Sequence, residues 1–250
     1  ARALTHFLAF ASSRSSMAAS MAAMSTSASG AAMDGEWDEA AGVWRGNRAV
    51  DAGVEVPDPL VIFGYGSLCW RPEPSFGEGA SYPCRVSGWG RFFAQRSTDH
   101  RGTPKSPGLV ATMLSDAQLE AIGLREAGVP PSSTIGMGYE IATESAEGVL
   151  ADLDFREKGG YTREVVLVQP LAGGEPVKAL LYSATPDNPN FDKTMLDPDA
   201  AATVIASAVG PSGSNAEYLS NLTEWLRSLE IEEPSLFDLE ERVKAAQGTS

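Results

Sequence analysis

The chain has 250 residues, 43% of them hydrophobic, which is enough to bury a sizeable core in one domain or two small ones. Its 19 lysine and arginine residues stand against 33 aspartate and glutamate residues, giving a net charge of −14. This acidity argues against nucleic acid or an anionic membrane surface as the main partner. We therefore expect a small-molecule ligand.

Cysteine and histidine are scarce in this sequence. Two cysteines, Cys69 and Cys84, cannot build a multi-disulfide scaffold or a cysteine-rich metal site. Two histidines, His6 and His100, argue in the same way against a histidine-based zinc site. No apolar run approaches the roughly 20 residues that span a bilayer. We expect a soluble, cytoplasmic protein without a metal site.

Residues 1–33 differ in composition from the rest of the chain. They contain Arg2 and Arg14, no acidic residue, and mainly alanine, serine and methionine, which is typical of an organelle transit peptide. A disordered extension, or a wrongly assigned start that precedes the true first methionine, would have the same composition. The segment that follows has no clear period. We therefore expect residues 1–57 to be a disordered or targeting leader and residues 58–246 to be the folded domain.

Short apolar runs predict the strands. Leu60–Phe63 is an apolar run that stops at Gly64, as expected for a strand buried on both faces. From Ile135 to Ile141, large apolar residues alternate with glycine and glutamate, which predicts a strand with one buried face. Further strands are expected at 84–86, 109–114, 164–168 and 177–182.

Four helices are expected from apolar residues at helical spacing, the first at about 144–155. The second opens with Asp197 and Pro198, a cap residue followed by a proline, and runs to Gly210. The third starts at Asn215 and continues to about residue 229. The fourth is expected to begin with a capping box formed by Ser235 and Asp238. With strands first and helices gathered late, the order predicts an α+β fold with a mostly antiparallel or mixed sheet.

The first candidate site is the sequence Gly64-Tyr65-Gly66-Ser67-Leu68, directly after the first strand. Two glycines two positions apart leave backbone N–H groups uncovered, and such a loop can bind a carboxylate or an oxyanion. A tight turn at the end of a strand would explain the same residues without a ligand. The lysine of a P-loop and the third glycine of a dinucleotide-binding fingerprint are missing.

Glu157 is the second candidate. It follows an amphipathic helix that breaks at Gly159 and Gly160, so it would stand at the end of a rigid element, where a carboxylate can face a ligand. The alternative is a surface charge cluster in which Arg156, Glu157 and Lys158 pair with one another and contribute little. The local pattern alone favours the surface cluster.

Two polar loops are weaker candidates. The segment 97–102 contains serine, aspartate and histidine, but three such residues in one short loop cannot form a catalytic triad, and the sequence has no nucleophile elbow. The segment 210–213 enters a helix, and a capped turn is enough to explain it.

Taken together and in order, these segments resemble the ChaC-type γ-glutamylcyclotransferases, the glutathione-specific branch of the γ-glutamylcyclotransferase-like enzymes. The resemblance spans about residues 61–229. Cys69 stands where the family usually has an aliphatic residue, and the stretch 115–133 is longer than in compact members. Five segments carry the resemblance: 63–68 with Trp70, 97–102 with Pro107 and Gly108, 153–161, 187–189, and 210–219.

The resemblance implies a small mixed β-barrel with flanking helices. It also implies a carbon–nitrogen lyase that cleaves glutathione to 5-oxoproline and cysteinylglycine with no metal or organic cofactor. In such an enzyme Glu157 would be the general base and acid. Action on γ-glutamylamines or other γ-glutamyl peptides, and binding of γ-glutamyl compounds without turnover, are the alternatives. The expected substrate-binding residues are Gly64, Tyr65, Gly66, Ser67, Leu68, Cys69 and Tyr218.

Overall fold

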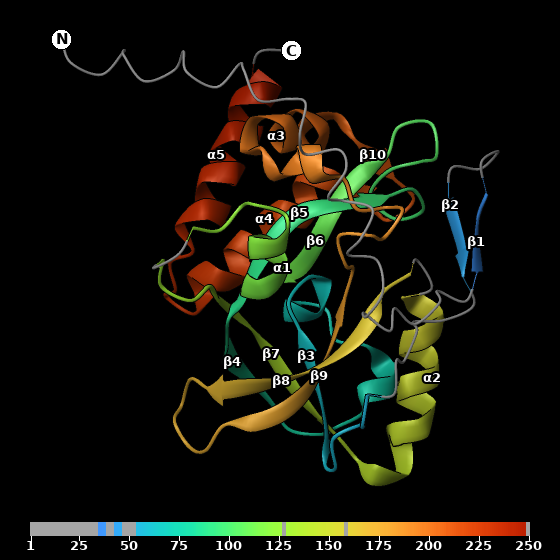
Figure 1. The fold of residues 1–250 in the computed structure, drawn as a ribbon, viewed down its shortest axis with the longest axis vertical. Coiled ribbons are helices and arrows are strands. Elements are labelled where there is room, and N and C mark those ends of the chain that lie inside the picture. The colour runs from blue at the N-terminus through green and yellow to red at the C-terminus, as the bar shows by residue number, and fades with distance from the viewer. Residues whose placement is uncertain (1–34, 39–42, 47–53, 127–128, 158–159, 249–250) are drawn as a thin grey trace, which may run out of the picture. The chain divides into compact units, whose positions relative to one another are not determined.

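The structure is a computed structural model of the chain, and it describes residues 35–38, 43–46, 54–126, 129–157 and 160–248. Its central element is a closed barrel of five strands in the order β3-β7-β4-β8-β9 (Figure 1). Neighbouring strands are antiparallel except β3 and β9, which are parallel, so the barrel is mixed, as predicted. The barrel strands are β3 (Leu60–Gly64), β4 (Ser81–Ser87), β7 (Ser133–Ile141), β8 (Thr162–Pro170) and β9 (Val177–Ser183).

A long hairpin of β5 (Trp89–Ser97) and β6 (Gly108–Ser115) forms a separate two-stranded sheet. Its register shifts between Phe92 and Gln95. The sequence pattern does not predict β5, because Phe93, Ala94 and Gln95 are all buried and leave no alternation of apolar and polar residues to detect. The bulge is what places successive side chains in the interior.

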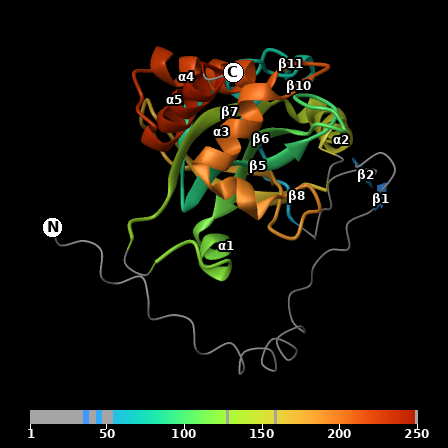
Figure 2. The ribbon, with the colours of Figure 1, turned by 90° about the horizontal axis from the view of Figure 1, so that it is seen from above.

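Three long helices gather beside this hairpin, as Figures 1 and 2 show: α3 (Pro198–Ser207), α4 (Asn215–Ser228) and α5 (Pro234–Gly248). A fourth, α2 (Ala146–Arg156), packs on the barrel. The four predicted helices are therefore confirmed in place, whereas the sequence pattern does not predict the short helix α1 (Asp116–Ala121). The remaining elements are short: η1 (Ser67–Cys69), η2 (Pro74–Phe76), η3 (Thr143–Ser145), η4 (Lys193–Leu196), β10 (Val209–Gly210) and β11 (Gly213–Ser214).

Helix starts and ends differ in part from the sequence prediction. Asp197 caps α3 as expected, with its side chain accepting hydrogen bonds from the backbone N–H groups of residues 199 and 200. The helix then ends at Ser207, before the bridge-forming residues of β10, and not at Gly210. The prediction that α5 begins with a capping box at Ser235 is wrong. The helix already begins at Pro234, and proline suits the first helical position.

The core of the described residues consists of two clusters, and β3 contributes side chains to both. Val61 and Phe63 lie in the larger cluster with the apolar face of α4, while Leu60 and Ile62 lie in the smaller cluster with Leu153 of α2. The prediction that β3 is buried on both faces is therefore confirmed. Both cores thus fix the point at which the chain leaves β3.

The segment before β3 contains one element that the sequence pattern does not predict. β1 (Gly35–Asp38) and β2 (Val43–Gly46) pair as an antiparallel hairpin. The targeting prediction rests on residues 1–33, which lie outside the described residues, so the leader stays a prediction. Val54 and Val56 are half-buried and pack against the smaller core cluster.

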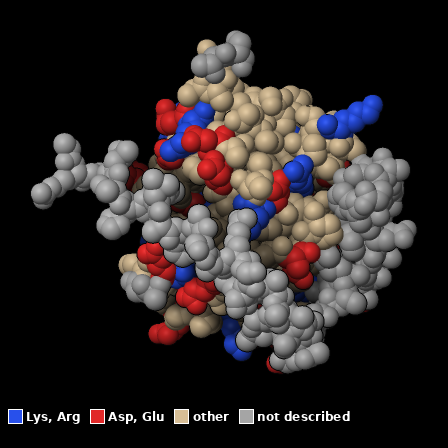
Figure 3. All heavy atoms as spheres, turned by 45° about the horizontal axis from the view of Figure 1, so that its top comes forward, with Lys and Arg blue, Asp and Glu red and all other residues tan. Residues whose placement is uncertain are grey.

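The structure shows how the basic residues are distributed on one face and how long and apolar the described helices are. On the face drawn in Figure 3, the described lysine and arginine residues lie singly or next to acidic ones, so this face has no continuous basic surface. Within the described ranges, no helix is both long and apolar enough to cross a membrane.

The two valines before β3 give a test of where the domain begins. We expect a chain starting at Asp58 to fold, but to unfold with about 1–2 kcal/mol less free energy than a chain starting at Val54, since two half-buried valines are lost. Urea denaturation of both chains measures this difference. Equal midpoints would mean that the valines contribute nothing, and an insoluble shorter chain would mean that the predicted boundary at residue 58 is wrong.

Candidate active site

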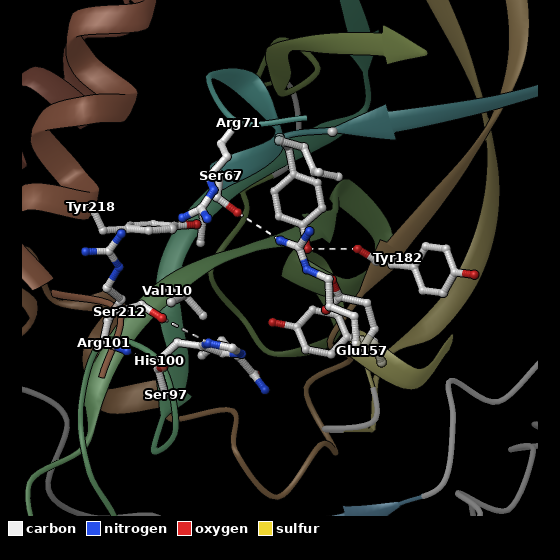
Figure 4. A pocket seen from close by; sticks show the side chains of 18 of the residues that line it. Ser67, Arg71, Ser97, His100, Arg101, Val110, Glu157, Tyr182, Ser212 and Tyr218 are labelled. Atoms are coloured by element: carbon white, nitrogen blue, oxygen red, sulfur yellow. Dashed lines mark hydrogen bonds and ion pairs between the residues drawn. The ribbon is translucent and has the colours of Figure 1, made fainter. Parts of the chain in front are cut away.

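A cavity of about 600 Å³ opens where the end of β3, the end of β5, the start of β6 and the end of α2 meet (Figure 4). It brings together residues from four segments that the sequence analysis singled out separately. Its lining includes Gly64, Tyr65, Gly66, Ser67 and Leu68 from the first segment, Ser97 to Arg101 from the third, Arg156, Glu157 and Tyr161 from the second, and Ser212, Glu217 and Tyr218 from the fourth.

The loop after β3 lines this cavity and has backbone donors without a partner among the described residues. The N–H of Cys69 donates to the carbonyl of Gly66 at 2.9 Å, and the N–H of Arg71 donates to the carbonyl of Ser67 at 2.8 Å, which closes the η1 turn. By contrast, no group in the part of the chain that the structure describes accepts a hydrogen bond from the N–H groups of residues 65–68. Successive uncovered N–H groups form an anion-binding site.

Both glycines of this loop are required by close contacts. A Cβ on Gly64 would lie 2.5 Å from the Cβ of Leu68, and a Cβ on Gly66 would lie 2.6 Å from the hydroxyl oxygen of Tyr218. Tyr218 in turn is held by edge-on contacts with Trp70 and Phe93, at ring-centroid distances of 5.3 and 5.8 Å. The loop therefore packs against α4 through Tyr218.

Glu157 is the residue directly after α2, and its backbone N–H still donates to the carbonyl of Leu153 at 2.8 Å. Its side chain is 20% exposed and faces the cavity (Figure 4). The Nε of Arg156 lies 3.3 Å from its Oε1, while the Nη2 of Arg156 donates to the hydroxyl of Ser67 at 2.9 Å. Arg156 also forms an ion pair with Glu73. The surface-cluster interpretation therefore does not describe this site, and Lys158 lies outside the described residues.

Burial controls the protonation of the groups around the cavity. It raises the pKa of Glu157 above the ordinary glutamate value, and the nearby Arg156 and His100 offset this only in part. Burial also raises the pKa values of Tyr65 and Tyr161 well above that of an ordinary tyrosine, and that of Tyr218 to about 12. These three phenols are consequently neutral at physiological pH.

A network of hydrogen bonds connects Tyr65, one of the tyrosines that line the cavity, to the barrel and to α2. The hydroxyl of Tyr65 donates to the carbonyl of Tyr182 at 2.8 Å, and the hydroxyl of Tyr182 donates to Asp154 at 2.8 Å. The Nε of Arg163 donates to the same Asp154 oxygen at 3.1 Å. Sequence reasoning missed Arg163 and Tyr182, because neither stands in a motif and only the β8–β9 pairing brings them together.

One expected binding residue does not line the cavity. The side chain of Cys69 is buried in the larger core cluster, and its Sγ–H donates to the carbonyl of Gly64 at 3.4 Å. Burial raises the pKa of this thiol to about 12, so it stays protonated. Cys69 thus holds the loop from the core side.

The two weaker candidate loops touch each other at the rim. The Nδ1 of His100 lies 3.3 Å from the hydroxyl oxygen of Ser212, and the Nη1 of Arg101 donates to the carbonyl of Ser214 at 3.0 Å. In the described ranges, no group of three or more histidine, cysteine, aspartate or glutamate residues has an arrangement that could hold a metal ion.

Comparison with known proteins places this site in a family. The family model described as ChaC-like protein matches residues 60–246. The chain belongs to the ChaC-like family. The match begins at the first residue of β3 and contains all the barrel strands and every cavity segment described above.

Individual ChaC-like relatives cover most of the same residues. The chain is 37% identical over 190 residues to the glutathione-specific gamma-glutamylcyclotransferase of Schizosaccharomyces pombe, covering 74% of this chain and 92% of that protein. It is 38% identical over 177 residues to glutathione-specific gamma-glutamylcyclotransferase 1 of Homo sapiens, covering 68% and 71%. A crystal structure of the gamma-glutamyl cyclotransferase specific to glutathione from yeast superposes with a TM-score of 0.67 at 31% identity, covering 76% of this chain and 98% of that one.

The contact between Gly66 and Tyr218 gives a test that needs no knowledge of the ligand. Gly66→Ala should lower the free energy of unfolding by about 1–3 kcal/mol, because the new methyl group meets the Tyr218 hydroxyl. Tyr218→Phe removes that hydroxyl, so the double variant should be less destabilised than the sum of the two single variants. Thermal unfolding of the three variants measures the coupling. If the two single losses in the free energy of unfolding simply added in the double variant, the Tyr218 hydroxyl would not be the group that the new methyl group meets.

Proposed function

We propose that the chain is a glutathione-specific γ-glutamylcyclotransferase, a carbon–nitrogen lyase that converts glutathione to 5-oxoproline and cysteinylglycine. The observation that carries the proposal is a largely buried carboxylate, Glu157, that lines the same cavity as a loop whose N–H groups, at residues 65–68, have no partner among the described residues. The relatives that cover most of this chain are named for this activity.

The reaction needs few groups from the protein, because both reacting atoms belong to the γ-glutamyl residue. Its α-amine attacks its own γ-carbonyl carbon and forms the five-membered lactam, while the bond from that carbon to the cysteinyl nitrogen breaks. The proton lost by the amine ends on the leaving nitrogen, so atoms balance without water. Holding the γ-glutamyl chain in a curled conformation supplies much of the acceleration.

Glu157 is the group suited to move that proton. Its raised pKa brings it closer to the range in which a carboxylate accepts a proton from an amine and returns it to a leaving nitrogen. Arg156 fixes its position relative to the loop, since one guanidinium contacts both Glu157 and the hydroxyl of Ser67. The Arg156 side chain therefore fixes the distance between the proposed base, Glu157, and the loop that would bind the anion.

The loop N–H groups would bind the negative charges of the γ-glutamyl residue. They can donate hydrogen bonds to its α-carboxylate or to the oxyanion that develops on the γ-carbonyl, and such fixed donors need no rearrangement during the reaction. The neutral phenols of Tyr65, Tyr161 and Tyr218 add no charge to compete with a bound carboxylate. A cavity of about 600 Å³ is large enough for a tripeptide.

Action on γ-glutamylamines or other γ-glutamyl peptides, and binding without turnover, are the alternatives. The presence of Glu157 in the cavity favours an enzyme over a binding module. The cytoplasmic location expected from composition stays a prediction, as does organellar targeting by residues 1–33.

Replacing Glu157 by glutamine separates its chemical role from its packing role. Glu157→Gln keeps the size of the side chain but cannot accept the proton, so kcat for glutathione should fall by roughly 10²–10⁴-fold, with a much smaller change in affinity. Glu144→Gln, an exposed position just before α2, serves as the matched control. A Glu157→Gln enzyme within a few-fold of the parent rate would remove this residue from the mechanism.

The raised pKa of Glu157 predicts the pH dependence. A general base works in its ionised form, so kcat/KM should rise with pH as Glu157 loses its proton, with a midpoint above that of an ordinary glutamate. The same profile recorded on the residual activity of Glu157→Gln should lack that limb. A limb that persists in the variant would belong to another group.

Substrate choice tests the glutathione branch. We expect reduced glutathione to be cleaved, and γ-glutamyl-ε-lysine and simple γ-glutamyl amino acids to react far more slowly. Mass spectrometry of 5-oxoproline and cysteinylglycine gives the comparison. Equal kcat/KM values for the three substrates would contradict the assignment and favour a general γ-glutamyl enzyme.

A further inference from the structure

Four arginines line the cavity among the described residues, and three of them already have acidic partners. Arg156 pairs with Glu73 and Glu157, the Nη1 of Arg101 lies 3.5 Å from Glu217, and the Nε of Arg96 donates to Asp192 at 3.1 Å. The fourth is Arg71. In the described part of the chain its guanidinium has no ion pair and no hydrogen bond, so its charge is available to a ligand.

The backbone of Arg71 is nevertheless held in a defined place. Its backbone N–H closes the η1 turn on the carbonyl of Ser67 at 2.8 Å, and the preceding Trp70 packs edge-on against Tyr218 at 5.3 Å. The turn that carries the uncovered N–H groups therefore also carries Arg71. Figure 4 shows its side chain on the Ser67 side of the cavity, extending toward Tyr218.

The proposed substrate has a charge that the site described so far does not bind. Glutathione carries two carboxylates, one on the γ-glutamyl residue and one on glycine. The loop N–H groups account for the first. The protein as a whole has a net charge of −14, so an anionic second group needs a local cation, and the other lining arginines are already paired.

We propose that Arg71 binds the glycyl carboxylate of glutathione and thereby selects the tripeptide over γ-glutamyl compounds that lack this group. A guanidinium matches a carboxylate with two parallel hydrogen bonds, which gives both affinity and orientation. This inference rests on the proposed function. The competing interpretations are an arginine that only contacts water, and one that binds the γ-glutamyl carboxylate instead.

The test compares two substrates in the full chain: reduced glutathione, and glutathione in which the glycyl carboxylate is converted to an amide. Three variants are measured, Arg71→Gln, Arg71→Lys and the control Arg85→Gln. Arg85 lies on β4 outside the cavity lining, where its side chain donates to the Ser133 hydroxyl at 3.3 Å. Production of 5-oxoproline gives kcat and KM for each pair.

We expect Arg71→Gln to lower kcat/KM for glutathione by roughly 10- to 100-fold, mainly through KM, since a charge-assisted hydrogen bond is lost. For the parent enzyme, kcat/KM should be lower for the glycyl amide than for glutathione by about the same factor. With the amide as substrate, Arg71→Gln should lower kcat/KM by less than about a further twofold. Arg71→Lys keeps the charge without the paired hydrogen bonds and should lie between parent and Arg71→Gln. Arg85→Gln should match the parent.

Each other outcome overturns the inference. No loss with glutathione means that Arg71 only contacts water. Equal losses with both substrates mean that it binds a group that the two share, such as the γ-glutamyl carboxylate. Failure of the proposed function looks different, because the parent chain itself would then release no 5-oxoproline from either substrate.

Discussion

The arrangement of the site depends on one guanidinium. Arg156 lies at the last position of α2, and it reaches the hydroxyl of Ser67, the carboxylate of Glu73 and the carboxylate of Glu157. A helix end and a loop that follows a strand nearly ninety positions earlier in the sequence are thereby fixed to each other. A half-buried cation with three partners is more strongly held than an isolated surface ion pair, because its partners limit its motion and part of its hydration is lost.

The rest of the cavity extends this constraint. Tyr65 contacts the backbone of β9, and Asp154, two positions before the end of α2, contacts Tyr182 on the same strand. The loop, the helix and the barrel wall are thus linked by hydrogen bonds that leave the loop N–H groups free. Such preorganisation matters most for a reaction in which the substrate supplies both reacting atoms and the protein mainly supplies geometry.

Local pattern was enough to predict the strands with clear apolar runs, the four longer helices and the glycine loop. It failed where side chains far apart in the sequence decide the outcome. Arg156 and Glu157 look like surface charges until Ser67 and Glu73 are placed beside them, and β5 shows no alternation because a bulge turns consecutive residues inward. The barrel and the role suggested for Glu157 came from the resemblance of ordered segments, which carries long-range information that periodicity lacks.

The two-sided burial of β3 has an evolutionary consequence. Ile62 belongs to one core and Phe63 to the other, and Gly64 follows them directly. A change of volume in either core therefore displaces the strand end from which the loop departs, even when the altered residue lies far from the cavity. Relatives that keep the loop geometry should tolerate substitutions in these cores mainly as compensating pairs of conserved total volume. The need to keep the cavity geometry then limits how fast core residues can change. Substitutions that affect the packing of α4 also affect the position of the loop, so the two are under selection together.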